Sequence, residues 1–416
     1  MSVVVPAAAL AALLVAMAQA GWEANPRLVQ QETARQKNVF NYEESQVGSF
    51  DLPDPLAAAR SRVRDPKAWA ARRAEIRELF RQHVYGRSPG KPEQLRFEVI
   101  ERNERAMEGA ATLERIAVLS SQQNRTHRFE LTVFLPGPAS PSGRPVPLLL
   151  LLNNRPATNT DPSRREKSGF WPAEQVIARG YGIAALQVGE LAPDDKDRFR
   201  EGVIRLFEGS AEGARPGDAW AALAAWGWGA SRAMDYFVTN PRIDASRVAV
   251  VGHSRGGKAA LWAGAEDERF ALVVSNESGE GGAALTRRNY GETLARITES
   301  FPHWFAGNYR AHAGRVASLP VDQHMLLSLI APRALYVASA DEDLWSDPRG
   351  EFLSVAYSSP VFALWGDRAI EPAAMPALEQ PLISGRRGYH IRRGPHNLTP
   401  YDWDRFVDFA DRSLRR

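Results

Sequence analysis

Cysteine is absent from the sequence, although the chain has 416 residues. Without cysteine there can be no disulfide bond, no thiolate nucleophile and no metal site with cysteine ligands. The absence excludes these kinds of chemistry. It does not locate the protein, because exported proteins without disulfide bonds also exist.

Concentrated charge and long apolar runs are scarce as well. The formal net charge is +3 at pH 7, and the basic residues are dispersed rather than gathered in a tract. A nucleic-acid partner is therefore not expected. Beyond the first twenty residues no apolar run is long enough for a transmembrane helix, and no internal repeat or low-complexity block is present.

The first twenty residues, MSVVVPAAALAALLVAMAQA, are the main apolar run and end in the small-residue pattern Ala18-Gln19-Ala20. This pattern predicts a signal peptide over residues 1–20. We therefore expect a periplasmic or secreted protein without membrane contact after cleavage. The run carries no Lys or Arg, so a membrane anchor or a misassigned start site is the alternative.

Residues 21–95 are polar, with several prolines, and contain one clear helix pattern over Trp69–Phe80. In this pattern Trp69, Ile76, Leu79 and Phe80 fall roughly on one face. We interpret residues 21–95 as an N-terminal extension that packs on the main domain rather than as a domain of its own.

Strand and helix patterns alternate from about residue 96 to the end. Strands are expected over Phe129–Leu135, Val146–Leu152, Tyr181–Val188, Val248–Val251, Phe270–Val274, Ala334–Ala338 and Tyr389–Arg392. Helices are expected over Gln175–Arg179, Asp218–Phe237, Lys258–Ala265 and Trp403–Leu414. Such alternation predicts an α/β fold in which helices cover both faces of a mainly parallel sheet, with residues 96–416 as one domain.

A serine stands at the junction of one predicted strand and its helix, in Gly252-His253-Ser254-Arg255-Gly256. The pattern G-x-S-x-G after a strand and before a helix is the nucleophile elbow of α/β-hydrolases. Glycine is needed two residues before and after the serine because the turn is sharp and strained. Without that context the same glycines would indicate only a tight turn.

A serine nucleophile needs a base, which in α/β-hydrolases comes late in the chain. Of the eight histidines, only His390 and His396 lie in the last ninety residues. His390 lies inside the last predicted strand and is interpreted as structural. His396 follows that strand on a loop before the closing helix, which is the position expected of the base.

The acid of the triad is ambiguous. Asp341, Glu342 and Asp343 follow the strand Ala334–Ala338, and Glu277 follows the preceding strand. A carboxylate at either strand end could orient His396 and stabilise its imidazolium form. Composition and spacing do not choose between them.

Several longer motifs resemble the bacterial glucuronoyl esterases of carbohydrate esterase family 15. The resemblance covers about residues 40–414 and is carried by NYEE (41–44), LPDPL (52–56), SRGGK (254–258), SNESGEGG (275–282), SFPHWF (300–305), LPVDQH (319–324), ADEDLW (340–345) and GPHNLTPYDW (394–403). It implies an α/β-hydrolase fold, a three-layer αβα sandwich with the N-terminal extension packed on it.

The resemblance also implies a role for each matching residue. Ser254 is the nucleophile and His396 the base, and Arg255 supplies its backbone N–H and guanidinium to the oxyanion. The family places its acid at the position of Glu277 or of Asp343. Both are present here, and Glu277 is slightly favoured.

Three further residues match sugar contacts of the family, namely Lys258, Glu292 and Trp345. Two positions depart from it: His253 and Gly257 stand where many members have Cys and Asn. We expect the His253 side chain to lie under the elbow with a structural role. Gly257 leaves the fine specificity open.

The resulting hypothesis is an exported, monomeric serine esterase without cofactor or metal. It cleaves esters between (4-O-methyl-)glucuronic acid side chains of glucuronoxylan and lignin alcohols. An acetyl xylan or feruloyl esterase on the same fold, or a non-catalytic carbohydrate-binding homologue, are the alternatives. The sequence leaves open whether xylan contacts a tryptophan-rich surface that includes Trp171 and Trp304.

Overall fold

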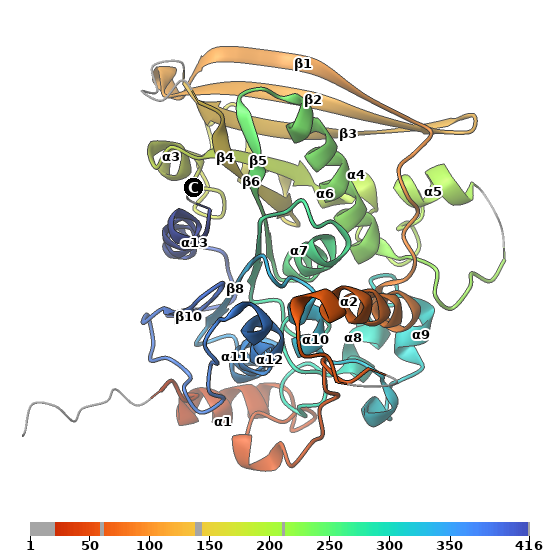
Figure 1. The fold of residues 1–416 in the computed structure, drawn as a ribbon, viewed down its shortest axis with the longest axis vertical. Helices are drawn as coiled ribbons and strands as arrows, with labels where there is room; N and C mark the ends of the chain where they lie inside the picture. Colours follow the sequence, from red (N-terminus) through yellow and green to blue (C-terminus); the bar gives the residue numbers. More distant parts are fainter. Residues whose placement is uncertain (1–20, 59–61, 138–143, 210–212, 415–416) are drawn as a thin grey trace, which may run out of the picture.

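The computed structural model describes residues 21–58, 62–137, 144–209 and 213–414 (Figure 1). The predicted signal peptide, residues 1–20, lies outside the described residues. Within the described residues ten strands form one sheet in the order β1-β2-β3-β5-β4-β6-β7-β8-β10-β9. None of the helices in these parts of the chain is both long and apolar enough to cross a membrane.

The centre of the sheet is parallel, as predicted. The strands from β5 to β10 in the spatial order run parallel, whereas β1, β2 and β3 on one side and β9 on the other are joined antiparallel. The strand bounds are β1 Gln94–Ala106, β2 Ala111–Gln122, β3 Arg125–Pro136, β4 Val146–Asn153, β5 Gly182–Gln187, β6 Ile243–His253, β7 Leu272–Asn276, β8 Ala334–Ala340, β9 Leu382–Ser384 and β10 Arg387–Arg392.

Three strands, β1, β2 and β9, were not predicted from the sequence. The side chains of β1 are exposed along almost all of its length, so it shows little of the hydrophobic alternation that marks a half-buried strand. β1 begins at Gln94 and enters the same sheet as the rest of the chain. The expected border near residue 95 therefore coincides with the first strand of the sheet.

Helices cover both faces of the sheet and make three layers. Figure 1 shows α3 and α13 on one side of the sheet and α6 and α7 on the other. The helix bounds are α1 Pro26–Arg35, α2 Pro66–Phe80, α3 Ala173–Ala178, α4 Val188–Leu191, α5 Val203–Glu208, α6 Ala222–Thr239, α7 Arg255–Glu266, α8 Leu294–Ser300, α9 Gly307–Arg310, α10 Gln323–Ser328, α11 Pro348–Tyr357, α12 Ser359–Phe362 and α13 Pro400–Ser413.

The continuous apolar runs of the central strands follow from burial on both faces. In β4, Leu150 and Leu152 belong to the core under α6 and α7, whereas Leu149 and Leu151 belong to the core under α3 and α13. Successive side chains of a strand point to opposite faces, so each face needs its own apolar set. The alternation of apolar and polar residues is therefore absent from these central strands.

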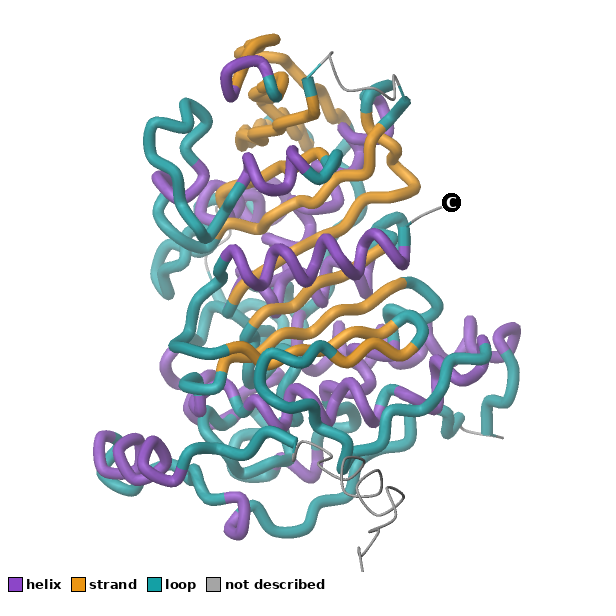
Figure 2. Tube along the Cα trace, turned by 90° about the vertical axis from the view of Figure 1, so that its left-hand side faces the viewer, coloured by secondary structure: helices purple, strands orange, loops and turns teal. Residues whose placement is uncertain are grey.

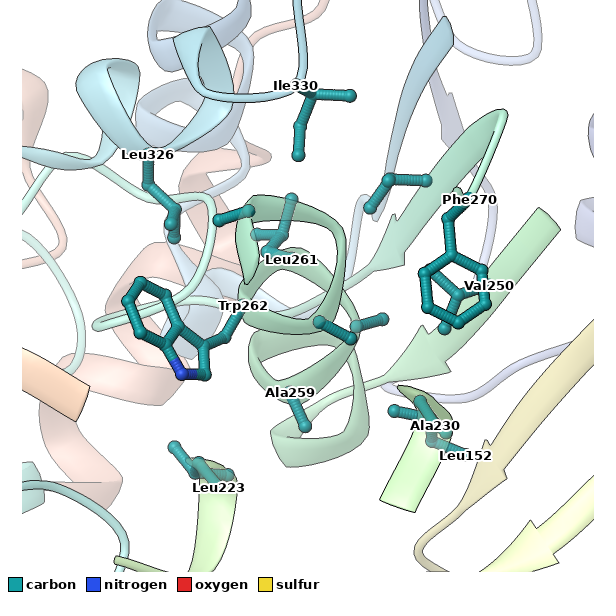
Figure 3. Packing of buried hydrophobic residues seen from close by; sticks show 14 of the residues in the cluster. Leu152, Leu223, Ala230, Val250, Ala259, Leu261, Trp262, Phe270, Leu326 and Ile330 are labelled. Atoms are coloured by element: carbon teal, nitrogen blue, oxygen red, sulfur yellow. The ribbon is translucent and has the colours of Figure 1, made fainter. Parts of the chain in front are cut away.

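Helix α7, which begins directly after Ser254, is almost completely buried. Figure 3 shows Leu261, Trp262 and Ala259 of this helix among apolar side chains of β6, α6 and the segment around Ile330. Burying a side chain the size of Leu261 contributes about 1.5–3 kcal/mol. The helix is thus fixed against the sheet, and with it the residue that precedes it.

Apolar side chains of helix α2 in the N-terminal region belong to this core. The predicted helix is α2, in which Trp69, Ile76 and Phe80 are buried. Helix α1 was not predicted, because within it only Val29 is buried. Its start is marked by Asn25, whose side chain accepts a hydrogen bond from the N–H of Arg27.

Candidate active site

Ser254 lies in the strained turn that the G-x-S-x-G motif predicts. Its backbone has φ 57° and ψ −127°, a conformation that is costly for a residue with a side chain. The turn is held by the N–H of Ser254, which donates to the carbonyl of Asn276 at 2.8 Å. A Cβ atom at Gly252 would overlap the backbone of Gly256, so the turn closes only with glycine there.

The turn presents Ser254 at the start of α7. The carbonyl of Ser254 accepts hydrogen bonds from the N–H groups of Gly257 at 2.9 Å and Lys258 at 3.2 Å. The first N–H groups of a helix have no acceptor inside it, and the helix dipole is positive at this end. Ser254 itself is partly exposed, so an incoming group can reach it.

His396 lies on the loop between β10 and α13, beside the elbow. Its ring centroid is 4.4 Å from that of His253, the residue before Ser254. The loop is shaped by Gly394, which has φ 100° and whose N–H donates to Oδ1 of Asp341 at 2.7 Å. The structure therefore places the predicted base against the residue that precedes Ser254.

Two carboxylates lie close to the same imidazole nitrogen. Nδ1 of His396 lies 2.6 Å from Oδ2 of Asp343 and 3.3 Å from Oε2 of Glu277. The sequence slightly favoured Glu277, but the shorter contact is made by Asp343. Of the neighbours of Asp343, Asp341 instead holds the loop of His396, and Glu342 is exposed.

Glu277 has a second partner that sequence reasoning missed. Arg392, at the end of β10, lies with Nη2 2.6 Å from Oε1 of Glu277 and with Nε 2.9 Å from Oδ2 of Asp402. The other oxygen of Glu277 accepts the N–H of Asn397 at 3.0 Å. An arginine in a short buried strand next to the base was the signal that could have indicated this network.

Two residues of this group, His396 and Glu277, have displaced pKa values. Burial lowers the pKa of His396, but the adjacent Asp343 and Glu277 raise it well above its usual range. Burial raises the pKa of Glu277, and the negative Asp343 adds to this rise, although His396 and Arg392 act against it. Protonated imidazole is thus the form that this pocket stabilises.

The same three residues are the one potential metal-ligand group found among the described residues. Ligand atoms of Glu277, Asp343 and His396 lie within 4.8 Å of one another. The Arg392 guanidinium, 2.6 Å from Glu277, would repel a bound cation. Because the Arg392 guanidinium already pairs with Glu277, the group fits an imidazole with its two carboxylates better than a metal centre.

The two other histidines near the site have structural contacts. His253 is fully buried, and its Nδ1 lies 2.6 Å from Oδ1 of Asn276. Burial keeps the pKa of His253 well below its usual value, which makes it a neutral support of the elbow. His390 is also buried, with Nε2 2.9 Å from Oδ1 of Asp402.

The guanidinium of Arg255 is held beside the elbow by groups from other loops. Its Nη1 forms an ion pair with Asp194, and Cζ lies 4.9 Å from the ring centroid of Trp304. Asp194 also accepts hydrogen bonds from Trp304 Nε1 at 2.6 Å and from His303 Nε2 at 2.9 Å. Sequence reasoning missed Asp194, because nothing local marks a residue on a long connecting segment.

The three predicted sugar-contact residues, Lys258, Glu292 and Trp345, form one neighbourhood. Lys258 is buried and donates to the carbonyl of Ser278, which leaves two of its three N–H donors for other acceptors. Burial lowers its pKa, opposed by Glu292 and other nearby carboxylates. Burial raises the pKa of Glu292, opposed by Lys258 and the Trp345 side chain.

The structure also bears on two points that the sequence left open. A Cβ atom at Gly257 would lie 3.0 Å from Cβ of Ser278 and 3.1 Å from the carbonyl of Gly252, so this position faces packed protein. Trp171 and Trp304 are buried rather than part of a surface, because each packs inside a core cluster. Neither tryptophan can stack on a polysaccharide chain without rearrangement.

Comparison with known proteins finds relatives of this chain among esterases. A family model described as glucuronyl esterase of fungi matches residues 213–366. Carbohydrate esterase MZ0003, from an unknown prokaryotic organism, is 37% identical over 91% of this chain and 93% of its own length.

Two solved structures extend the likeness to the whole fold. The glucuronoyl esterase of Solibacter usitatus is 39% identical, with a TM-score of 0.82 over 90% of this chain and 100% of its own. A promiscuous CE15 esterase from a marine bacterial metagenome is 36% identical, with a TM-score of 0.81 over 90% of this chain and 100% of its own.

Proposed function

Since the chain belongs to the glucuronoyl esterases of carbohydrate esterase family 15, a family of carboxylic ester hydrolases, we propose that Ser254, His396 and the Asp343–Glu277 pair form its catalytic machinery. The substrate is an ester between a (4-O-methyl-)glucuronic acid side chain of glucuronoxylan and a lignin alcohol. The observation that carries the proposal is the strained elbow of Ser254 with the imidazole of His396 against the residue before it.

In the first half of the reaction the hydroxyl of Ser254 attacks the ester carbonyl and His396 takes its proton. Asp343 and Glu277 stabilise the imidazolium through Nδ1, which leaves Nε2 for the serine. The backbone N–H and guanidinium of Arg255 donate to the oxyanion, where a charged donor makes the stronger hydrogen bond. The alcohol leaves with the proton from His396.

In the second half, His396 takes a proton from a water molecule that attacks the acyl carbonyl, and it returns this proton to the oxygen of Ser254 as the uronic acid is released. Lys258 and Glu292 hold the sugar through its hydroxyl groups, and the Trp345 ring packs against it. Every step uses acid–base and nucleophilic chemistry of residues in this chain.

The test is hydrolysis of benzyl glucuronate by the wild type and by Ser254→Ala. We expect the variant to lose nearly all activity, and equal rates would refute the mechanism. Covalent labelling by a fluorophosphonate, abolished in His396→Ala, separates a working esterase from a non-catalytic homologue. Rates on acetylated xylan and on feruloyl esters decide between a narrow and a promiscuous enzyme, an alternative raised by the relative described as promiscuous.

Export through the predicted signal peptide and a monomeric state belong to the same proposal. A secreted enzyme would meet its polysaccharide outside the cytoplasm. The mass of the mature chain in the culture medium, measured together with its elution volume, tests both expectations.

A further inference from the structure

The N-terminal segment, residues 22–44, packs beside the predicted sugar-contact residues. The ring of Phe40 packs edge-on against Trp345, with 4.8 Å between the ring centroids. The N–H of Gly291, next to Glu292, donates to the carbonyl of Asn41 at 2.9 Å. This segment is therefore attached to the part of the site that would hold the sugar.

This segment lines a crevice of about 480 Å³. Its lining comprises aromatic, aliphatic and charged side chains: Trp22, Glu23, Ala24, Pro26, Val29, Gln30, Tyr42, Glu43, Glu44 and Arg349. Trp22 and Tyr42 share one small apolar cluster with Tyr290 and Trp345. The crevice thus adjoins the predicted sugar site through a common set of rings.

Helix α1, which lines the crevice, lies toward the same side of the molecule as the loop of His396. In Figure 2 the C-terminal end of α13 is marked on the right, so the start of this helix, which follows the loop of His396, lies on the left. Helix α1, which contributes Pro26, Val29 and Gln30 to the crevice, lies at the lower left of the same view.

One lining group has a polar atom that no protein partner satisfies. The Tyr42 side chain is 1% exposed, and among the described residues its hydroxyl has no hydrogen-bond partner. Burial raises the pKa of Tyr42, so the hydroxyl stays protonated and can donate. A buried hydroxyl without a partner is costly, and a ligand hydroxyl would remove this cost.

The charges of the crevice select against anions. Glu23, Glu43 and Glu44 outnumber the one cationic lining residue, Arg349, which lies 3.9 Å from Glu44. Arg288, outside the lining, pairs with Glu44 at 2.8 Å, so Glu23 and Glu43 carry the remaining negative charge. Exposed carboxylates accept hydrogen bonds from hydroxyl groups, and the Trp22 ring offers an apolar face. This combination suits a neutral ligand that is rich in hydroxyl groups.

We propose that this crevice is a binding subsite for the neutral sugar chain that carries the glucuronoyl group, with Tyr42, Trp22 and Glu43 as its recognition groups. The inference rests on the proposed function, because it assigns the part of the same substrate that lies beyond the ester. It also accounts for chain binding in a protein whose Trp171 and Trp304 are buried.

The experiment compares two substrates that share the ester: benzyl glucuronate and a xylotriose that carries the methyl ester of glucuronic acid. Tyr42→Phe removes only the unpartnered hydroxyl and keeps the ring in its cluster. We expect the KM for the xylotriose ester to rise about fivefold relative to that for benzyl glucuronate, the size of one net hydrogen bond. The change in kcat is expected to be the same for both substrates.

Glu43→Gln and Trp22→Ala extend the comparison to the other recognition groups, with thermal unfolding as a check on folding. Tyr357→Phe is the matched control, because its ring lies near His324, away from the crevice. We expect this control to leave the ratio of the two KM values at the wild-type level. Equal effects of Tyr42→Phe on both substrates would overturn the subsite.

Direct binding separates this proposal from the function on which it rests. Xylotetraose, which has no ester, is titrated calorimetrically into Ser254→Ala and into Ser254→Ala with Tyr42→Phe. We expect binding to the first and at least fivefold weaker binding to the second. No binding to either protein would overturn the subsite, whereas a wild type inactive on benzyl glucuronate would overturn the proposed function.

Discussion

Nδ1 of His396 lies 2.6 Å from Oδ2 of Asp343, and this is the shortest contact of the imidazole with a carboxylate. Glu277, 3.3 Å from the same nitrogen, is fully buried and shares its charge with Arg392. A carboxylate whose charge is divided in this way stabilises the imidazolium less. We therefore expect Asp343 to be the main acid and Glu277 its support.

The first prediction separates the two acids. Asp343→Asn should slow the hydrolysis of benzyl glucuronate by about 10- to 100-fold, because Glu277 still faces Nδ1. Glu277→Gln should cost less, and the double change should approach about 10⁴-fold. Steady-state rates of the three variants check this order, which is wrong if Glu277→Gln alone costs as much as the double change.

The second prediction concerns pH. The base must be neutral His396, and its raised pKa means that this form prevails only above that pKa. Activity should therefore fall on the acid side at a higher pH than for an isolated histidine. Asp343→Asn removes the nearer negative charge and lowers the pKa, so the acid limb of kcat/KM should move to lower pH. A pH profile that is unchanged in the variant contradicts the assignment.

The third prediction concerns the oxyanion. Burial raises the pKa of Asp194, but hydrogen bonds from His303 and Trp304 and the charge of Arg255 lower it to about 2, so it stays ionised. Asp194→Asn should free the Arg255 guanidinium and lower kcat about tenfold with little change in KM, because the donor acts mainly in the transition state. Asp195→Asn, on the exposed neighbour, is the control and should leave kcat unchanged.

The fourth prediction concerns stability. Arg392 is buried between Glu277 and Asp402, so Arg392→Met leaves both carboxylates without their cation. The expected loss is about 3–5 kcal/mol in the free energy of unfolding, measured by urea denaturation. Arg393→Met removes the next arginine, whose side chain is 72% exposed, and should change stability by less than about 0.5 kcal/mol.

The fifth prediction tests the elbow itself. Gly252→Ala places a methyl group into the backbone of Gly256, so the turn must open and the activity should be lost. Gly189→Ala is the control, because a Cβ atom there meets nothing within 4 Å and Gly189 lies in α4. Fluorophosphonate labelling of both variants distinguishes a displaced nucleophile from an unfolded chain, which circular dichroism would reveal.

Much of the fold could be predicted from local patterns. The apolar runs of β4, β5 and β6 marked strands that are buried on both faces, and their alternation with helices indicated the parallel sheet. The edge strand β1 and helix α1 could not be predicted, because most of their residues are exposed and few of them are apolar.

By itself, the sequence determined the candidates that we propose as nucleophile and base. The elbow depends on the sterics of five consecutive residues, so Ser254 could be identified from its neighbours alone, and His396 followed from its place after the last central strand. Only the tertiary structure decided which carboxylate approaches His396, that Arg392 and Asp194 hold the site, and that a crevice adjoins Trp345. These relationships join segments that are far apart in the chain. The distances from His396 Nδ1 to Asp343 and Glu277, 2.6 Å and 3.3 Å, differ so little that the packing of whole loops decides which carboxylate is nearer.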